Sequence, residues 1–192
     1  MLEAPKKLAV VLLAGGVSKR FGSNKLVAEV QGMPLVSTAI RLLESQMPVQ
    51  KIAIVSSIYH GELQTYFDPS WQVAIQSDSD SQPWDSLQLA KALLNQKDVS
   101  SVLVHLADMP HVSETYLQKM ACSQKSLVSR IAGQTTPPFV LVGKDRQWLD
   151  DSRKDFRNAL AGLKHIEAEP GLFRDIDTKE DVVGLDGTSG RT

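Results

Sequence analysis

Residues 8–26, LAVVLLAGGVSKRFGSNKL, predict both the fold and the place of the functional site. The aliphatic run at 8–13 has no polar alternation, which is typical of a strand covered on both faces in a parallel sheet. Gly15 and Gly16 follow at once, and because neither has a Cβ, the backbone can turn sharply there and approach a ligand closely.

A cationic loop comes next, containing Ser18, Lys19, Arg20 and Lys25. Such a loop at the carboxyl end of a buried strand suits a polyanion, above all phosphate. It is not a Walker loop, because Gly22 is not followed directly by Lys and then Ser or Thr, and the dinucleotide pattern GxGxxG is absent.

The stretch resembles the signature LAxGxSxRxGxxK of the MobA-like nucleotidyltransferases. The matching positions are Leu13, Ala14, Gly16, Ser18, Arg20, Gly22 and Lys25. The resemblance runs from Leu8 to Asp181 and implies Mg²⁺-dependent transfer of CMP or GMP from CTP or GTP to the molybdopterin cofactor. It also implies a single-domain, Rossmann-like three-layer α/β sandwich with a mostly parallel sheet, as in nucleotide-diphospho-sugar transferases.

Composition is that of a soluble globular protein, with 42% hydrophobic and 22% charged residues. A length of 192 residues suits one domain, expected over 1–184, with a disordered tail at 185–192. The net charge of -1 argues against general nucleic-acid binding, and Cys122, the only cysteine, excludes an intrachain disulfide. The N-terminal hydrophobic run is too short for a signal peptide or a membrane span, so we expect a cytoplasmic protein without a membrane partner.

Hydrophobic periodicity predicts alternating strands and helices, which indicates a doubly wound parallel sheet. The predicted strands are 8–13, 51–56, 71–76, 101–106, 126–131 and 139–142, with 164–167 as a further short strand. The predicted helices are 35–47, 60–67, 83–96, 113–123 and 144–162. We expect a loop at 132–138 and interpret the polar segment 77–82 as a solvated loop, the alternative being a border of the nucleotide base.

An aspartate stands at the carboxyl end of a predicted central strand. Asp108 follows the strand at 101–106, where a carboxylate is costly unless it binds something, and Pro110 fixes the turn behind it. We interpret Asp108 as a Mg²⁺ ligand, the alternative being a turn-capping aspartate. His105, inside the same strand, is expected to be a buried, hydrogen-bonded core residue.

Two acidic motifs extend the family resemblance. The segment 107–110, ADMP, resembles the family motif GDxP, and 175–181, DIDTKED, resembles the closing DIDTPED. The resemblance implies Asp108 and Asp177 as metal ligands, and Asp175 is expected to be structural. Without a metal, two such carboxylates should repel each other.

The expected nucleotide-binding residues are Leu13, Ala14, Gly15, Gly16, Ser18, Arg20, Lys25 and Ser86, the last resembling a serine that the family places near the base. Lys25, Arg20 and Asp108 are the expected catalytic residues. We assign Arg20 to the β- and γ-phosphates and Lys25, expected to be exposed, to the α-phosphate. The base stays open, because Gly15 favours GTP whereas 24–26 resemble the members that use CTP.

Two other functions remain open at this stage. One is a sugar-phosphate or isoprenoid-precursor nucleotidyltransferase, which shares the fold and the loop. The other is a non-catalytic nucleotide-binding maturation factor with a molybdoenzyme partner. Its support is a departure from the family's GDxGAR motif, in whose place this chain has Asp150, Asp151, Arg153 and Arg157 without the glycines.

Overall fold

The computed structural model describes residues 7–77, 83–95, 97–150, 160, 162–168, 171 and 176–186. Several sequence expectations fall outside these residues: most of the polar loop at 77–82, Asp175, the positions 151–157 and the end of the chain from 187.

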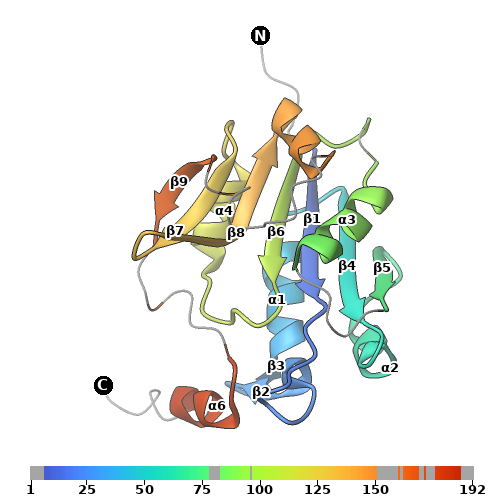
Figure 1. Ribbon diagram of the computed structural model, residues 1–192, viewed down its shortest axis with the longest axis vertical. Coiled ribbons are helices and arrows are strands. Elements are labelled where there is room, and N and C mark those ends of the chain that lie inside the picture. The colour runs from blue at the N-terminus through green and yellow to red at the C-terminus, as the bar shows by residue number, and fades with distance from the viewer. Residues whose placement is uncertain are drawn as a thin grey trace.

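A seven-stranded sheet forms the middle of the molecule, in the order β5-β4-β1-β6-β8-β7-β9 (Figure 1). Its strands are β1 (Leu8–Ala14), β4 (Gln50–Ser56), β5 (Trp71–Gln76), β6 (Ser101–Leu106), β7 (Leu127–Ile131), β8 (Gln134–Val142) and β9 (Lys164–Glu167). Only β8 runs against its neighbours, since it pairs antiparallel with both β6 and β7. The predicted α/β fold with a mostly parallel sheet is therefore confirmed.

Helices cover both faces of this sheet. The helices in the described part of the chain are α1 (Leu35–Glu44), α2 (His60–Leu63), α3 (Pro83–Leu93), α4 (Glu114–Ala121) and α6 (Lys179–Asp186), with 3₁₀ turns η1 (Lys25–Val27), η2 (Gln64–Tyr66) and η3 (Gly143–Asp150). A small hairpin, β2 (Glu29–Val30) and β3 (Met33–Pro34), precedes α1. Helices α1 and α4 pack on one face of the sheet and α3 on the other (Figure 1), which makes the three layers.

Successive residues of β1 point to opposite layers, as a pleated strand requires. Val10 and Leu12 belong to the core under α1 and α4, whereas Val11 and Leu13 belong to the core under α3. All seven residues of the strand are buried. The aliphatic run is therefore unbroken because both faces of β1 are covered, as the sequence indicated.

Helix α1 is shorter than predicted at its carboxyl end. It stops at Glu44, and Met47 takes a left-handed φ of 50° and is 86% exposed. Pro48 follows Met47, and a residue before proline is disfavoured in the α-helical region. The helix therefore ends before the apolar position that periodicity assigned to its buried face.

The loop predicted at 132–138 is wrong, because β8 already begins at Gln134 and pairs with β7 from there. The error has a physical reason in Pro137 and Pro138, which lack the N–H groups of a regular ladder. The register shifts at this point, and the Ser129 hydroxyl donates to the Pro138 carbonyl at 2.6 Å. Two prolines thus lie inside a strand, at an irregularity in its pairing.

Of the helix predicted at 144–162, the described residues show the 3₁₀ turn η3 (Gly143–Asp150).

No helix among the described residues is both long and apolar enough to cross a membrane.

His105 on β6 is fully buried, as expected. Contrary to the expectation that it is hydrogen-bonded, neither ring nitrogen has a partner among the described residues. Burial lowers the pKa of His105 from 6.5 to about 4, because the apolar core disfavours the imidazolium ion.

This gives a testable pH dependence. Below pH 6.5 the unfolded chain takes up a proton on His105 that the folded chain does not, so stability should fall by up to about 3 kcal/mol towards pH 4. His105→Leu should remove this part of the acid loss. Urea midpoints at pH 7.5 and 5 measure it, with the exposed His165 replaced by Gln as the control. An unchanged acid loss in His105→Leu would contradict the assignment.

Candidate active site

The site lies where the sheet reverses its winding order. Strand β1 is parallel to β4 on one side and to β6 on the other, so the chain moves away from β1 in both directions. Open α/β sheets bind ligands at the carboxyl ends of the strands at such a point. Here the two strand ends are joined, since the Ala107 N–H donates to the Leu13 carbonyl at 3.1 Å.

The loop after β1 curls around Ser18, which takes a left-handed φ of 49°. Its carbonyl accepts from the N–H groups of Phe21 and Gly22, at 3.0 and 3.3 Å. Its hydroxyl accepts from the Lys25 N–H at 3.3 Å. These bonds close the loop on itself and bring Lys25 back towards the strand end.

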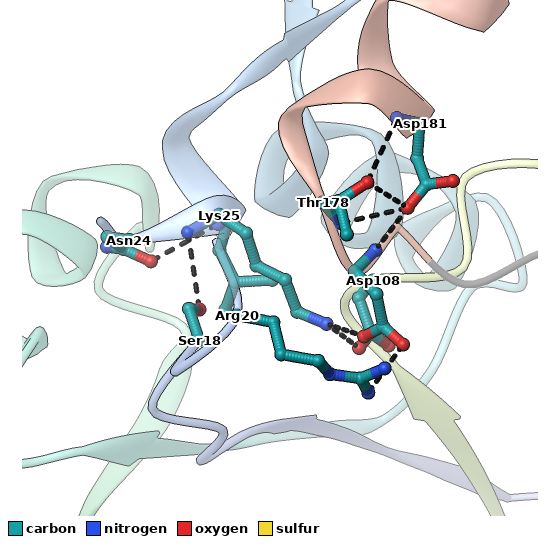
Figure 2. Close-up of polar contacts among 9 residues, drawn as sticks. Ser18, Arg20, Asn24, Lys25, Asp108, Thr178 and Asp181 are labelled. Carbon is teal, nitrogen blue, oxygen red and sulfur yellow. Dashed lines mark hydrogen bonds and ion pairs between the residues drawn. The ribbon is translucent and has the colours of Figure 1, made fainter. Parts of the chain in front are cut away.

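Lys25 joins the two predicted carboxylates, and Figure 2 shows its side chain pointing towards Asp108. Its Nζ donates to Asp108 Oδ2 at 2.6 Å and to Asp177 Oδ1 at 3.2 Å. Arg20 Nη2 lies 2.7 Å from the other oxygen of Asp177. The four residues come from the loop after β1, the end of β6 and the segment before α6, so the structure brings together side chains that are far apart in the sequence.

Lys25 is not exposed, contrary to the sequence expectation: only 10% of its side chain is accessible, against 73% for Arg20. Burial alone would lower the pKa of Lys25. Asp108 and Asp177 outweigh that effect by attraction and hydrogen bonding, and the pKa is raised above its ordinary value of 10.5. Lys25 therefore keeps its charge at neutral pH, and it stands between two carboxylates that would otherwise repel each other.

An apolar contact positions Asp177. Ile176 is fully buried in a small cluster with Phe21, Val30 and Leu35, and its N–H donates to the Asp108 carbonyl at 3.2 Å. The hydrophobic residue inside the DIDT motif is thus an anchor that fastens the C-terminal segment to the loop and to β6.

A capping box completes this segment and begins α6. The Thr178 N–H donates to Asp181 Oδ2 at 2.8 Å, and the Asp181 N–H donates to Thr178 Oγ1 at 3.4 Å (Figure 2). The Asp177 N–H donates to the same Asp181 oxygen at 3.1 Å. Lys179 is the first residue of α6, the position where proline is favoured but not needed, which explains why the family's proline can be replaced here.

Gln76 and Ser86 lie beside Gly15, at the start of the loop. Ser86 on α3 is buried and donates to Gln76 Oε1 at the end of β5. A Cβ on Gly15 would lie 2.7 Å from that Gln76 oxygen and 3.2 Å from Ser86 Oγ. A Cβ on Gly15 would therefore displace the end of the Gln76 side chain, whereas a Cβ on Gly16 would meet nothing within 4 Å. Leu13 and Ala14 are buried at the end of β1.

The sequence reading did not assign Gln76, Asn24 or Ile176. Ile176 carried a signal, since a single aliphatic residue between acids at the end of a domain is typical of an anchor. The capping box Thr178-x-x-Asp181 was also readable. No sequence pattern indicates a role for Gln76, because the contacts of a polar residue at the end of a strand depend on which residues the fold places beside it.

The glycine pair provides a matched test. Gly15→Ala should destabilise the protein by about 1–2 kcal/mol, because the added Cβ displaces the Gln76–Ser86 pair. Gly16→Val should melt like the wild type but lose nucleotide binding, because we expect a ligand to approach the backbone through the open space at this position. Thermal melts and titration calorimetry with CTP and GTP separate the two effects. Normal nucleotide affinity in Gly16→Val would remove Gly16 from the binding site.

A cationic glycine loop beside paired carboxylates at a switch point is the arrangement expected of a phosphate-handling site in an α/β transferase. The chain matches the MobA-like NTP transferase domain over residues 10–169 and belongs to that family. It is a nucleotidyltransferase.

Relatives of this chain carry out transfers of that kind. The 2-C-methyl-D-erythritol 4-phosphate cytidylyltransferase of Bacillus velezensis is 26% identical over 197 residues, covering 93% of this chain and 82% of that protein. A probable molybdenum cofactor guanylyltransferase of Pyrococcus horikoshii is 29% identical over 113 residues, or 58% of this chain and 53% of that one.

Solved structures share the fold. Rv0371c from Mycobacterium tuberculosis superposes with a TM-score of 0.77 at 16% identity, over 95% of this chain and 98% of that one. A complex of the same mycobacterial protein with manganese has a TM-score of 0.71, at 15% identity over 95% of this chain and 98% of that one.

Proposed function

We propose that this protein transfers CMP or GMP from CTP or GTP to a phosphorylated acceptor, the molybdopterin cofactor, with release of pyrophosphate. The observation that carries the proposal is the position of Lys25 between Asp108 and Asp177, beside the glycine loop at the switch point. An acceptor phosphate oxygen forms a bond to the α-phosphorus, and the bond from that phosphorus to the pyrophosphate breaks.

The two cations divide the nucleotide between them. Arg20 is largely exposed and can turn towards the β- and γ-phosphates, whereas Lys25 is buried at the strand end and serves the α-phosphate. Both now pair with Asp177. An incoming polyphosphate exchanges these carboxylate contacts for phosphate contacts.

The carboxylates fit a divalent metal ion. Asp108 and Asp177 converge on one cation, the Lys25 ammonium, and carboxylate oxygens are the ligands that Mg²⁺ prefers. No group of three or more His, Cys, Asp or Glu side chains gathers around a common point in the described part of the chain. Two carboxylates leave positions for phosphate and water oxygens, as is usual for Mg²⁺. When bound, the ion neutralises charge on the phosphates.

A general base is not required in this reaction. The second pKa of a phosphate monoester is about 6, so the acceptor is largely ionised at neutral pH. The protein then has to align the two substrates and neutralise charge. The raised pKa of Lys25 agrees with that role, because the residue supplies positive charge and no proton.

The acceptor distinguishes the proposal from its alternatives. The Bacillus velezensis relative favours an isoprenoid-precursor acceptor as the second candidate. Pyrophosphate release would be measured with CTP or GTP, Mg²⁺ and either molybdopterin or 2-C-methyl-D-erythritol 4-phosphate. A thermal-shift panel of CTP, GTP, ATP and UTP identifies the base. Nucleotide binding without pyrophosphate release from either acceptor would favour a non-catalytic molybdoenzyme maturation factor.

Replacing Lys25 and replacing Arg20 should have different effects on turnover and on nucleotide affinity. Lys25→Met should lower kcat by about 100-fold or more, because its charge matters most as negative charge develops at the α-phosphate. It should also lower the melting temperature, because Asp108 and Asp177 lose the cation between them. Arg20→Ala should melt normally and mainly weaken nucleotide affinity. Steady-state kinetics and calorimetry decide, and normal nucleotide affinity in Arg20→Ala would contradict its β,γ-phosphate role.

The acids should act as one unit. Asp108→Asn and Asp177→Asn should each abolish most Mg²⁺-dependent turnover, and the double variant should be little worse than either. The free Asp108→Asn protein should melt earlier than the wild type, because Lys25 loses its nearest partner.

Glu180→Gln removes an exposed carboxylate from the same segment and serves as the control. A double-mutant cycle on kcat at saturating Mg²⁺ is the measurement. Rate losses that simply add would show that Asp108 and Asp177 do not share a site.

A further inference from the structure

The phosphate loop is tied to a second element, the short helix α2. Leu63 of α2 is fully buried in the core under α1 and α4, so this helix is fixed to the body of the protein. Two bonds run between it and the loop. The Tyr59 hydroxyl donates to the Val17 carbonyl at 3.1 Å, and Asn24 Nδ2 donates to Glu62 Oε2 at 2.9 Å.

Asn24 also starts the turn that carries Lys25. Its Oδ1 accepts from the Leu26 N–H at 3.2 Å, which makes it the N-cap of η1 (Figure 2). A backbone N–H can only donate, so the amide oxygen faces Leu26 and the amide nitrogen faces Glu62. Asn24 is 4% exposed. Its side chain therefore has one conformation that satisfies both partners.

We propose that Asn24 and Glu62 form a positioning pair that holds Lys25 at the α-phosphate. Tyr59 supports this pair through its own bond to the loop. The proposal rests on the role of Lys25 given above. Lys25 reaches its carboxylates through a long, flexible side chain, so the place of its Cα decides where the ammonium lies. The cap sets that place relative to the turn, and the bond to Glu62 sets it relative to the core.

This arrangement predicts a loss of rate more than a loss of affinity. A displacement of about 1 Å in a group that aligns reactants can cost about 100-fold. The nucleotide also binds through Arg20 and the backbone near Gly16, so its affinity should change less than the rate. A merely structural pair would instead lower stability and leave the rate per folded molecule unchanged.

The polarity of the hydrogen bond can be reversed to test this. Asn24→Asp keeps an oxygen for the Leu26 N–H but places a second carboxylate against Glu62. Adding Glu62→Gln supplies an amide that donates to the new carboxylate and restores the bond. We expect Asn24→Asp to lower kcat about 10- to 100-fold with little change in KM for the nucleotide, and the double variant to return to within about 3-fold of the wild type.

A matched control exists elsewhere in the chain. Asn95 Nδ2 donates to Asp98 Oδ2 far from the loop in sequence and at an exposed position. Asn95→Asp makes the same chemical change there and should leave kcat unchanged. Tyr59→Phe deletes the second tie without adding charge and should lower kcat about 3- to 10-fold, which keeps the proposal testable if Asn24→Asp folds poorly.

Hydrogen exchange of the amides at 16–26 reports on the loop without any turnover. Faster exchange in Asn24→Asp, reversed by Glu62→Gln, supports the pair even if the chosen acceptor proves wrong. A wild type that releases no pyrophosphate from any acceptor would overturn the proposed function alone. Full kcat and unchanged exchange in a folded Asn24→Asp protein would overturn the positioning pair.

Discussion

Lys25 holds a positive charge where water reaches little of its side chain, and such a charge is tolerated only when carboxylates surround it. Asp108 and Asp177 supply them from the end of β6 and from the segment before α6. One ammonium group therefore fixes the relative positions of three chain segments. In the proposed reaction the same group binds phosphate, so the contact that holds the site together is also the contact that a nucleotide would take over.

Apolar packing makes this ionic contact possible. Ile176 is buried against Phe21 and Leu35, and this apolar contact brings the C-terminal segment to the phosphate loop independently of the charges. The flanking Asp177 then has little freedom, and the capping box at Thr178 and Asp181 sets the direction in which the chain leaves. A hydrophobic anchor beside a functional acid gives accuracy that a solvated loop would lack.

The two ends of the site have different characters. Around Lys25 and Arg20 the proposed chemistry is charge neutralisation, which would serve any nucleoside triphosphate. Around Gly15, Gln76 and Ser86 the surroundings are tightly packed, and a Cβ on Gly15 would displace the end of the Gln76 side chain.

The sequence by itself determined the strand predicted at 8–13 and the mostly parallel architecture, and it singled out Lys25, Arg20, Asp108 and Asp177 as candidate site residues, because these follow from local runs and short motifs. It did not determine that Lys25 is buried between the acids, that Gln76 meets Ser86, or that β8 passes through Pro137 and Pro138. Only the tertiary structure decided those points. Burial and pairing depend on segments up to 152 positions apart, as for Lys25 and Asp177, and no local pattern records which distant residue will lie opposite.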